Sequence, residues 1–131
     1  MHEYKTKIKR FVDGDTVDVD IDLGFGIVLV KQRIRLYGID TKEEKFYGKL
    51  AGQFLKDQCK KGSCITLRTH LDKKGKFGRI LGEIIVDGVN INQLMVEQHM
   101  AVEYHGQSKT DIHKEHMFNR QELNRAGIKY S

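Results

Sequence analysis

The chain contains no proline and no tryptophan, only two cysteines, and no long uninterrupted apolar run. Without proline, its turns must depend on the 13 glycines and on Asx residues. No apolar segment approaches the roughly 20 residues that cross a bilayer, which excludes a helical membrane protein. The N-terminal segment Met1–Lys5 lacks the apolar stretch of a secretory signal. Cys59 and Cys64 have no second cysteine pair, which excludes a zinc ribbon and favours free thiols over a local disulfide.

What the chain has in excess is positive charge. Its formal net charge is +5 at pH 7 and its pI is about 9.2, which favours a polyanionic partner such as nucleic acid. The basic residues are spread along the chain, so charge alone is weak evidence. At 131 residues, with 39% hydrophobic and 31% charged residues, we expect one soluble domain over 1–131. The absence of a long heptad pattern favours a monomer.

The N-terminal third has the alternation of β-strands. Lys5–Leu23 alternates, most clearly where four apolar residues share one parity and Asp18, Asp20 and Asp22 take the other, which predicts a strand with one buried face. The apolar set is Val17, Val19, Ile21 and Leu23. After a turn at residues 24–26, Ile27–Ile39 is predicted to be a second long strand, antiparallel to the first.

The rest of the chain alternates helices and strands irregularly. A three-to-four-residue apolar period predicts a helix ending at Gly62, with Phe46, Leu50, Phe54 (or Leu55) and Cys59 (or Gln58) on its inner face. Strands follow at Cys64–His70 and Arg79–Val86, and Asp87-Gly88 makes a tight turn. Asn90 is a candidate N-cap for a short helix with Ile91, Leu94 and Met95 inward. Ser108 and Asp111 resemble a capping box that opens a last helix, which continues to Gly127.

This order predicts an α+β fold: a five-stranded OB-type Greek-key β-barrel with about three α-helices. The pattern disfavours a doubly wound α/β sheet, because strands and helices do not alternate regularly.

Carboxylates at two strand ends are candidate metal ligands. Asp15 has the parity of the buried valines, and an ionised carboxylate on that face is costly unless a cation meets it. Asp40, at the end of a predicted strand, supplies a second oxygen donor, and the carbonyl of Thr41 a third. Hard oxygen donors of this kind suit Ca²⁺. Taken alone, however, Asp-Gly-Asp-Thr is first of all a turn sequence.

Two arginines and a glutamate complete a candidate catalytic set. Arg35 and Arg79 can clamp a phosphate by charge-assisted hydrogen bonds and stabilise the charge of a phosphorane. Glu43 can orient or deprotonate an attacking water. Taken singly, the arginines are better explained as ordinary surface or strand-end residues, and Lys73, Lys74 and Lys76 as a solvated loop. The combination is more specific than any member.

Over nearly its whole length the sequence resembles the staphylococcal nuclease (thermonuclease) family, especially the compact members carried by phages and prophages. The motifs that carry the resemblance are Val12–Val17, Arg35–Thr41, Lys76–Arg79, Asp87–Asn90 and the terminal helix. The resemblance implies an enzyme that hydrolyses phosphodiester bonds of DNA or RNA with little sequence preference. It also implies a location in the host cytoplasm or with a phage.

Carried over by position, the resemblance assigns roles to individual residues. Ca²⁺ is held by Asp15, Asp40 and the Thr41 carbonyl, and phosphate by Arg35 and Arg79. Asp13 supports the metal ligands without binding the ion itself. The residues expected to contact the nucleotide, by charge or by stacking, are Lys76, Phe77 and Tyr104, and Lys74 adds charge in the same basic loop.

The chain departs from the family pattern after Thr41. The family has Asp-Thr-Pro-Glu and then a loop before the helix, whereas here Lys42, Glu43 and Glu44 follow without proline. In one alignment Glu43 is the catalytic glutamate and the loop after it is shortened. In the other the loop is missing, and Glu43 and Glu44 are acidic residues of the first helical turn. The second alignment favours an alternative function, a catalytically impaired OB-type module that binds nucleic acid or protein.

Histidines on the last helix suggest a zinc site less well than they suggest ordinary packing. His113 and His116 lie three residues apart beside Glu115 without a further ligand nearby, so we expect one core-facing and one solvated histidine. Cys64 has no neighbouring base in the sequence and is predicted to be a strand residue, not a nucleophile.

Overall fold

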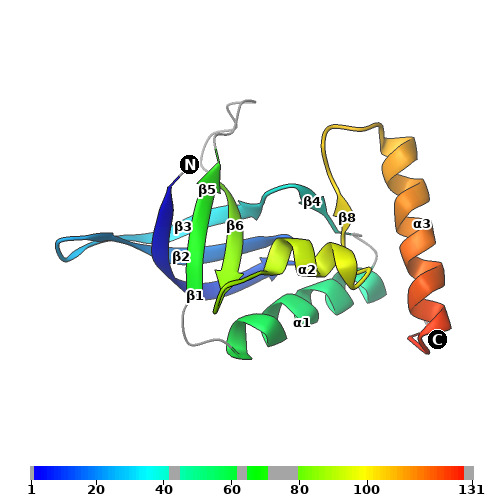
Figure 1. The fold of residues 1–131 in the computed structure, drawn as a ribbon, viewed down its shortest axis with the longest axis horizontal. Helices are drawn as coiled ribbons and strands as arrows, with labels where there is room; N and C mark the ends of the chain where they lie inside the picture. The colour runs from blue at the N-terminus through cyan, green and yellow to red at the C-terminus, as the bar shows by residue number, and fades with distance from the viewer. Residues whose placement is uncertain (1, 42–44, 62–64, 71–79, 129–131) are drawn as a thin grey trace.

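The computed structural model describes residues 2–41, 45–61, 65–70 and 80–128, and the longer strands among them form a closed barrel. Around the barrel the order is β3, β2, β1, β5 and β6, and a parallel pairing between β3 and β6 closes the ring. The bounds are β1 Glu3–Asp13, β2 Thr16–Gly24, β3 Ile27–Leu36, β5 Ile65–His70 and β6 Ile80–Val86. This mixed barrel with its helices confirms the predicted α+β fold of OB type (Figure 1).

Two predicted strand boundaries were wrong. Lys5–Leu23 is two strands, β1 and β2, because the chain reverses at Gly14–Asp15 and Asp13 pairs with Thr16 across the turn. The alternation of β1 is interrupted by bulges between Ile8 and Arg10 and between Phe11 and Asp13, so the regular alternation of β2 does not extend back through the turn. The second predicted strand, Ile27–Ile39, ends at Leu36, since Gly38 turns the chain at φ 77° before β4 (Ile39–Asp40).

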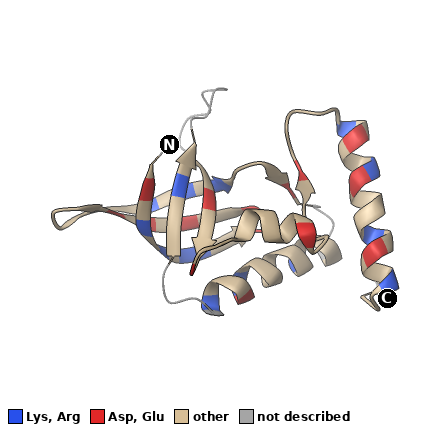
Figure 2. Ribbon diagram, viewed as in Figure 1, with Lys and Arg blue, Asp and Glu red and all other residues tan. Residues whose placement is uncertain are grey.

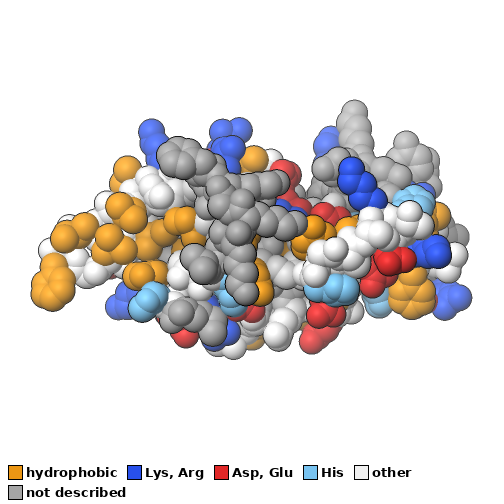
Figure 3. Space-filling model, turned by 90° about the horizontal axis from the view of Figure 1, so that it is seen from above, with side chains coloured by type: hydrophobic (Ala, Val, Ile, Leu, Met, Phe, Trp, Pro, Cys, Tyr) orange, Lys and Arg blue, Asp and Glu red, His pale blue; other side chains and the backbone are white. Residues whose placement is uncertain are grey.

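Inward-facing residues of the strands fill the barrel. Val17, Val19 and Ile21 are buried as predicted, but Leu23 is 41% exposed. The reason is that β1 pairs with β2 only as far as Asp22, and the hairpin of β2 and β3 projects beyond the barrel (Figure 1). Its tip is apolar and forms the orange projection of Figure 3, with Phe25 fully exposed at the turn.

Helix α1 (Lys45–Lys61) covers one end of the barrel (Figure 1). Of the predicted inner face, Leu55 and Cys59 are buried, whereas Phe46, Leu50 and Phe54 are only half-buried. Tyr47 and Ala51 complete the buried face. Two apolar stripes lie side by side on this helix, and the stripe with the small Ala51 allows the closer approach to the barrel. The predicted end at Gly62 lies outside the described residues.

The two later helices begin as their capping residues predict. Asn90 caps α2 (Ile91–Glu97) by accepting a hydrogen bond from the Gln93 N–H at 3.2 Å. Ser108 caps α3 (Lys109–Arg125) by accepting from the Asp111 N–H at 3.1 Å. Two short strands, β7 (Val89–Asn90) and β8 (Val102–Glu103), flank α2. Within the described residues, no helix combines the length and apolarity needed to cross a membrane.

Helix α3 carries both signs of charge along its length, as Figure 2 shows, and buries few side chains. His116 and Leu123 are buried, whereas His113 is exposed. The expectation of one core-facing and one solvated histidine is therefore confirmed. Within the described part of the chain, no three His, Cys, Asp or Glu side chains are grouped to hold a metal ion.

Gly14 provides the first testable consequence of the packing. A Cβ there would lie 2.9 Å from Thr41 Oγ1 and 3.2 Å from Ala51 Cβ, whereas a Cβ on Gly52 would lie 4.0 Å from its nearest neighbour, the Gly14 N. We expect Gly14→Ala to destabilise the protein by about 1–3 kcal/mol through overpacking. Gly52→Ala, within α1, should instead stabilise it by roughly 0.5–1 kcal/mol. Urea denaturation of both variants measures this difference, and equal effects would contradict the packing described.

Candidate active site

The turn between β1 and β2 places the Asp15 carboxyl. The Asp15 N–H donates to Asp13 Oδ1 at 3.1 Å, and the Thr16 hydroxyl donates to Asp15 Oδ1 at 3.1 Å. The turn is also tied to the end of β3, because the Leu36 N–H donates to the Asp15 carbonyl at 2.8 Å. Backbone and side-chain hydrogen bonds therefore fix Asp15 beside the strand that carries Arg35.

Arg35 lies between two carboxylates. Its neighbours Ile34 and Leu36 point into the core, so the alternation of β3 turns Arg35 to the outside of the barrel. Its Nη1 is 3.3 Å from Asp15 Oδ2, and its Nη2 is 3.7 Å from Asp40 Oδ1. Nη1 also donates to the Leu36 carbonyl at 3.0 Å. Only 18% of the Arg35 side chain is exposed, so its charge is poorly screened by solvent.

Asp40, the last residue of β4, and Thr41, which follows it, also belong to the site. The backbone of Asp40 pairs with Val102 of β8, and its Oδ2 lies 2.8 Å from His116 Nε2 on α3. Thr41 is buried, and its N–H points to Asp15 Oδ2 at 3.5 Å. The fold thus brings Asp15, Arg35, Asp40 and Thr41 into one cluster, although they come from three separate segments.

The two acidic residues of the turn have opposite pKa shifts. Burial raises the pKa of Asp15 to about 6, and hydrogen bonding to Asp13 adds to this rise while the Arg35 charge opposes it. Burial also acts to raise the pKa of Asp13, but hydrogen bonds with Asp15 and Thr16 and the charge of Arg35 outweigh it and leave that pKa lowered. One guanidinium therefore does not fully compensate the buried Asp15 carboxylate.

Because the charge of Arg35 does not fully compensate the Asp15 carboxylate, the cluster has the electrostatics to accept a second cation. The available donors are carboxylate oxygens of Asp15 and Asp40 and the carbonyl of Thr41, which are ligands that Ca²⁺ accepts. Because Ca²⁺ takes six to eight oxygens, an ion there would draw part of its coordination from water. Two carboxylates and a carbonyl fit this chemistry, although only two of these three ligands are acidic side chains.

The other predicted site residues divide into two groups. The backbone of Tyr104 lies beside the turn that precedes Asp40, because the Tyr104 N–H donates to the Gly38 carbonyl at 2.7 Å. Ile80 pairs with Ile34, the residue before Arg35. Outside the described residues lie Glu43, Lys74, Lys76, Phe77 and Arg79. Their roles remain predictions.

Neither cysteine alters this description. Burial raises the pKa of the Cys59 thiol to about 11, so it stays protonated and unreactive at neutral pH. Cys64 lies outside the described residues.

Sequence reasoning missed the contact of His116 with Asp40 and a stacked pair of rings. The rings of Tyr37 and His70 are 3.8 Å apart and 3° from parallel, and His70 Nε2 lies 2.8 Å from Glu83 Oε2. Hydropathy gave no signal for either feature, because the partners are far apart in the chain. The nearest indication in the sequence was the expectation that one of His113 and His116 faces the core.

An OB-type barrel thus gathers two aspartates and an arginine from the β1–β2 turn, β4 and the end of β3. Residues 33–127 match the family described as Staphylococcal nuclease homologue, and the chain belongs to this family. The matched range contains Arg35 and Asp40 but begins after Asp15, which the structure nevertheless places beside them.

The chain is also similar to two curated proteins. The chain is 30% identical over 115 residues to "Endonuclease YhcR" of Bacillus subtilis (strain 168), an alignment that covers 78% of this chain and 9% of the relative. It is 33% identical over 100 residues to an uncharacterized protein of Bacillus anthracis, covering 71% of this chain and 44% of the relative. The chain thus spans less than half the length of these relatives. Family and relative together support a nuclease-type function.

The raised pKa of Asp15 predicts a pH-dependent stability. The unfolded carboxyl releases its proton near pH 3.8 and the folded one near pH 6, so the folded protein loses stability as the pH rises through this interval. Asp15→Asn, which is always neutral, should be more stable than the wild type near pH 7 in EDTA, by roughly 1–3 kcal/mol. The difference should disappear near pH 4.

Asp18 provides the control for this prediction. Its pKa is lowered by the hydrogen bond from Arg33, so Asp18→Asn should give no stabilisation near pH 7. Urea denaturation at both pH values measures the effect. A wild type that is more stable than Asp15→Asn near pH 7 would show that Arg35 already compensates the carboxylate.

Proposed function

We propose that this protein is a Ca²⁺-dependent nuclease that hydrolyses phosphodiester bonds of DNA, RNA or both with low sequence specificity. The observation that carries the proposal is the position of the Arg35 guanidinium, 3.3 Å from Asp15 and 3.7 Å from Asp40. A surface that only attracts nucleic acid needs positive charge, and buried carboxylates beside the arginine would weaken it. Carboxylates together with an arginine suit a site that holds a cation and a phosphate at once.

Asp15, Asp40 and the Thr41 carbonyl would hold the Ca²⁺ ion. When bound there, Ca²⁺ would supply Lewis-acid polarisation of a phosphoryl oxygen. Asp13 fixes the turn that presents Asp15, through its hydrogen bond with the Asp15 N–H. This explains why an acidic residue that is mostly exposed belongs to the site without contacting the ion.

Arg35 supplies charge to the phosphate. A guanidinium donates in a fixed plane and stabilises the negative charge that develops on the equatorial oxygens. We assign the same role to Arg79, since the next residue in the chain, Ile80, pairs with β3 at Ile34. Glu43, which follows Thr41 by two residues, is the proposed base that takes the proton from the attacking water.

The substrate is a nucleic acid strand recognised through its backbone and base faces. Lys74 and Lys76 add positive charge for the phosphates, and Phe77 and Tyr104 offer rings against which a base can pack. None of these groups reads base edges in a fixed pattern, so the expected sequence preference is weak. The net charge of +5 supports the attraction of a polyanion.

Nicking of supercoiled plasmid with Ca²⁺, and with EDTA, tests the proposed function. We expect cleavage only with Ca²⁺, and Arg35→Lys should lower the turnover rate by roughly 10²-fold or more, because a lysine cannot reproduce the planar contacts. Arg33→Lys is the matched control, since Arg33 lies two residues earlier on β3, has a half-exposed side chain and pairs with Asp18 at 3.0 Å. Binding without cleavage by the wild type would favour the alternative, an OB-type binding module.

Glu43 and Glu44 decide between the two alignments of the segment after Thr41. If Glu43 is the base, Glu43→Gln should keep the fold and Ca²⁺ binding while lowering the turnover rate by roughly 10²-fold or more. Glu44→Gln should have little effect, and helix-dipole contributions cancel because the two substitutions are adjacent and identical. Equal, small losses in a protein that still cleaves would exclude Glu43 as the base.

A further inference from the structure

His116 of α3 lies against the cluster of Asp15, Arg35 and Asp40, where it contacts Asp40. Its Nε2 is 2.8 Å from Asp40 Oδ2, and only 8% of its side chain is exposed. The other oxygen of the same carboxylate, Oδ1, faces Arg35 at 3.7 Å. The two oxygens of Asp40 therefore have different partners, one from β3 and one from α3.

The direction of this hydrogen bond follows from the acceptor. An ionised carboxylate can only accept, so Nε2 carries the hydrogen and donates it, whether the ring is neutral or charged. A hydrogen bond to one oxygen sets the rotation of the carboxylate about its own axis. It also leaves the remaining lone pairs of Asp40 available on the side of the cluster.

The backbone of Asp40 gives little rigidity of its own. Strand β4 has only two residues, and it pairs with β8, which also has two. The Asp40 side chain is 31% exposed, so packing alone does not fix it. A carboxylate on such a short strand needs a side-chain partner if it is to keep one orientation.

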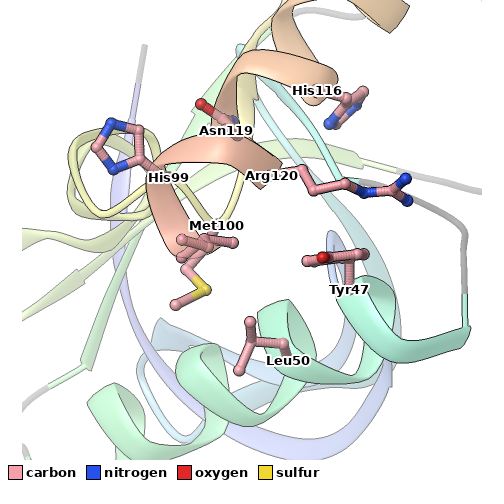
Figure 4. Close-up of a pocket in the computed structure, with 8 residues that line it drawn as sticks. Tyr47, Leu50, His99, Met100, His116, Asn119 and Arg120 are labelled. Atoms are coloured by element: carbon pink, nitrogen blue, oxygen red, sulfur yellow. The ribbon is translucent and has the colours of Figure 1, made fainter. Parts of the chain in front are cut away.

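Helix α3 is anchored well enough to provide that partner. The Asn119 amide donates to the Ala101 carbonyl at 3.0 Å, next to β8. The Arg120 guanidinium lies 4.6 Å above the ring of Tyr47 on α1, and Leu123 is buried. Figure 4 shows Asn119 and Arg120 of α3 and Tyr47 of α1 around a hollow that His116 also lines. His116 therefore extends from a fixed support.

We propose that His116 is a positioning residue that holds the Asp40 carboxylate in the orientation that binds Ca²⁺, which makes α3 part of the metal site. The inference rests on the proposed function, since it takes Asp40 as a metal ligand. Hydrogen bonds to ligating carboxylates pre-orient them, and losing such a partner typically lowers metal affinity by about 10- to 100-fold.

Two amide substitutions of His116 separate a positioning role from simple packing. The amide nitrogen of His116→Gln can reach the place of Nε2, whereas that of His116→Asn is one methylene shorter. We expect His116→Asn to weaken Ca²⁺ binding by about 10- to 100-fold and His116→Gln to keep most of the wild-type affinity. His113→Asn, an exposed position on the same helix, should match the wild type.

Calorimetric titration with Ca²⁺ gives the affinities, and thermal unfolding in EDTA shows whether each variant is folded. Rescue by glutamine in two variants of similar stability supports the proposal, because a merely structural loss would not follow the reach of the amide. Equal affinities for His116→Asn, His116→Gln and the wild type would overturn the positioning role alone. A wild-type protein that binds no Ca²⁺ would overturn the proposed metal site and, with it, this inference.

Discussion

The contact of Arg35 with Asp15 and Asp40 is the interaction on which the rest of the site depends. Two carboxylates brought together in a poorly solvated place repel each other, and a guanidinium between them reduces that repulsion. Because the three residues come from the β1–β2 turn, the end of β3 and β4, their contact also fixes the relative positions of these segments. The site is therefore a product of barrel closure, and no single segment contains it.

Close packing behind the charged groups gives the same segments little freedom. Gly14 lies against Thr41 and Ala51, so the β1–β2 turn, β4 and α1 meet at a point where a methyl group would not fit. The Leu36 N–H joins the turn to β3 through the Asp15 carbonyl. Asn92, which is buried, donates to the carbonyls of Tyr37 and Gly82 and so ties α2 to the β3–β4 connection and β6. Apolar packing and buried hydrogen bonds thus both converge on the residues that flank Arg35.

The sequence predicted the barrel because alternation is a local property of a strand, and residues 17–22 of β2 show it clearly. It did not predict the reversal at Gly14, because the alternation of β2 was extended back over β1, whose own alternation is interrupted by bulges. On α1 the alternatives Leu55 and Cys59 are buried as predicted, but Phe46 and Leu50 are not, because their stripe is as apolar as that of Tyr47 and Ala51 and only the barrel surface decides between them. Motifs located Asp15, Arg35 and Asp40, but nothing local relates Asp40 to His116, which lies 76 residues away. Such a partner follows from the path of the whole chain.

The burial of Asp15 shows how a site can oppose the stability of the fold that carries it. A carboxyl whose pKa is about 6 remains partly protonated in mildly acidic solution, and its ionisation at neutral pH works against folding. A neutral residue would remove this penalty, and the turn at Gly14 does not need the charge, because Asp13 already accepts the Asp15 N–H. A local requirement of the fold therefore does not account for an ionisable group at this position. A cation that binds the folded protein would offset the unfavourable ionisation and gain affinity from it, since the same charge that destabilises the protein without metal attracts the ion. The excess negative charge around Asp15 is thus better explained by binding than by folding.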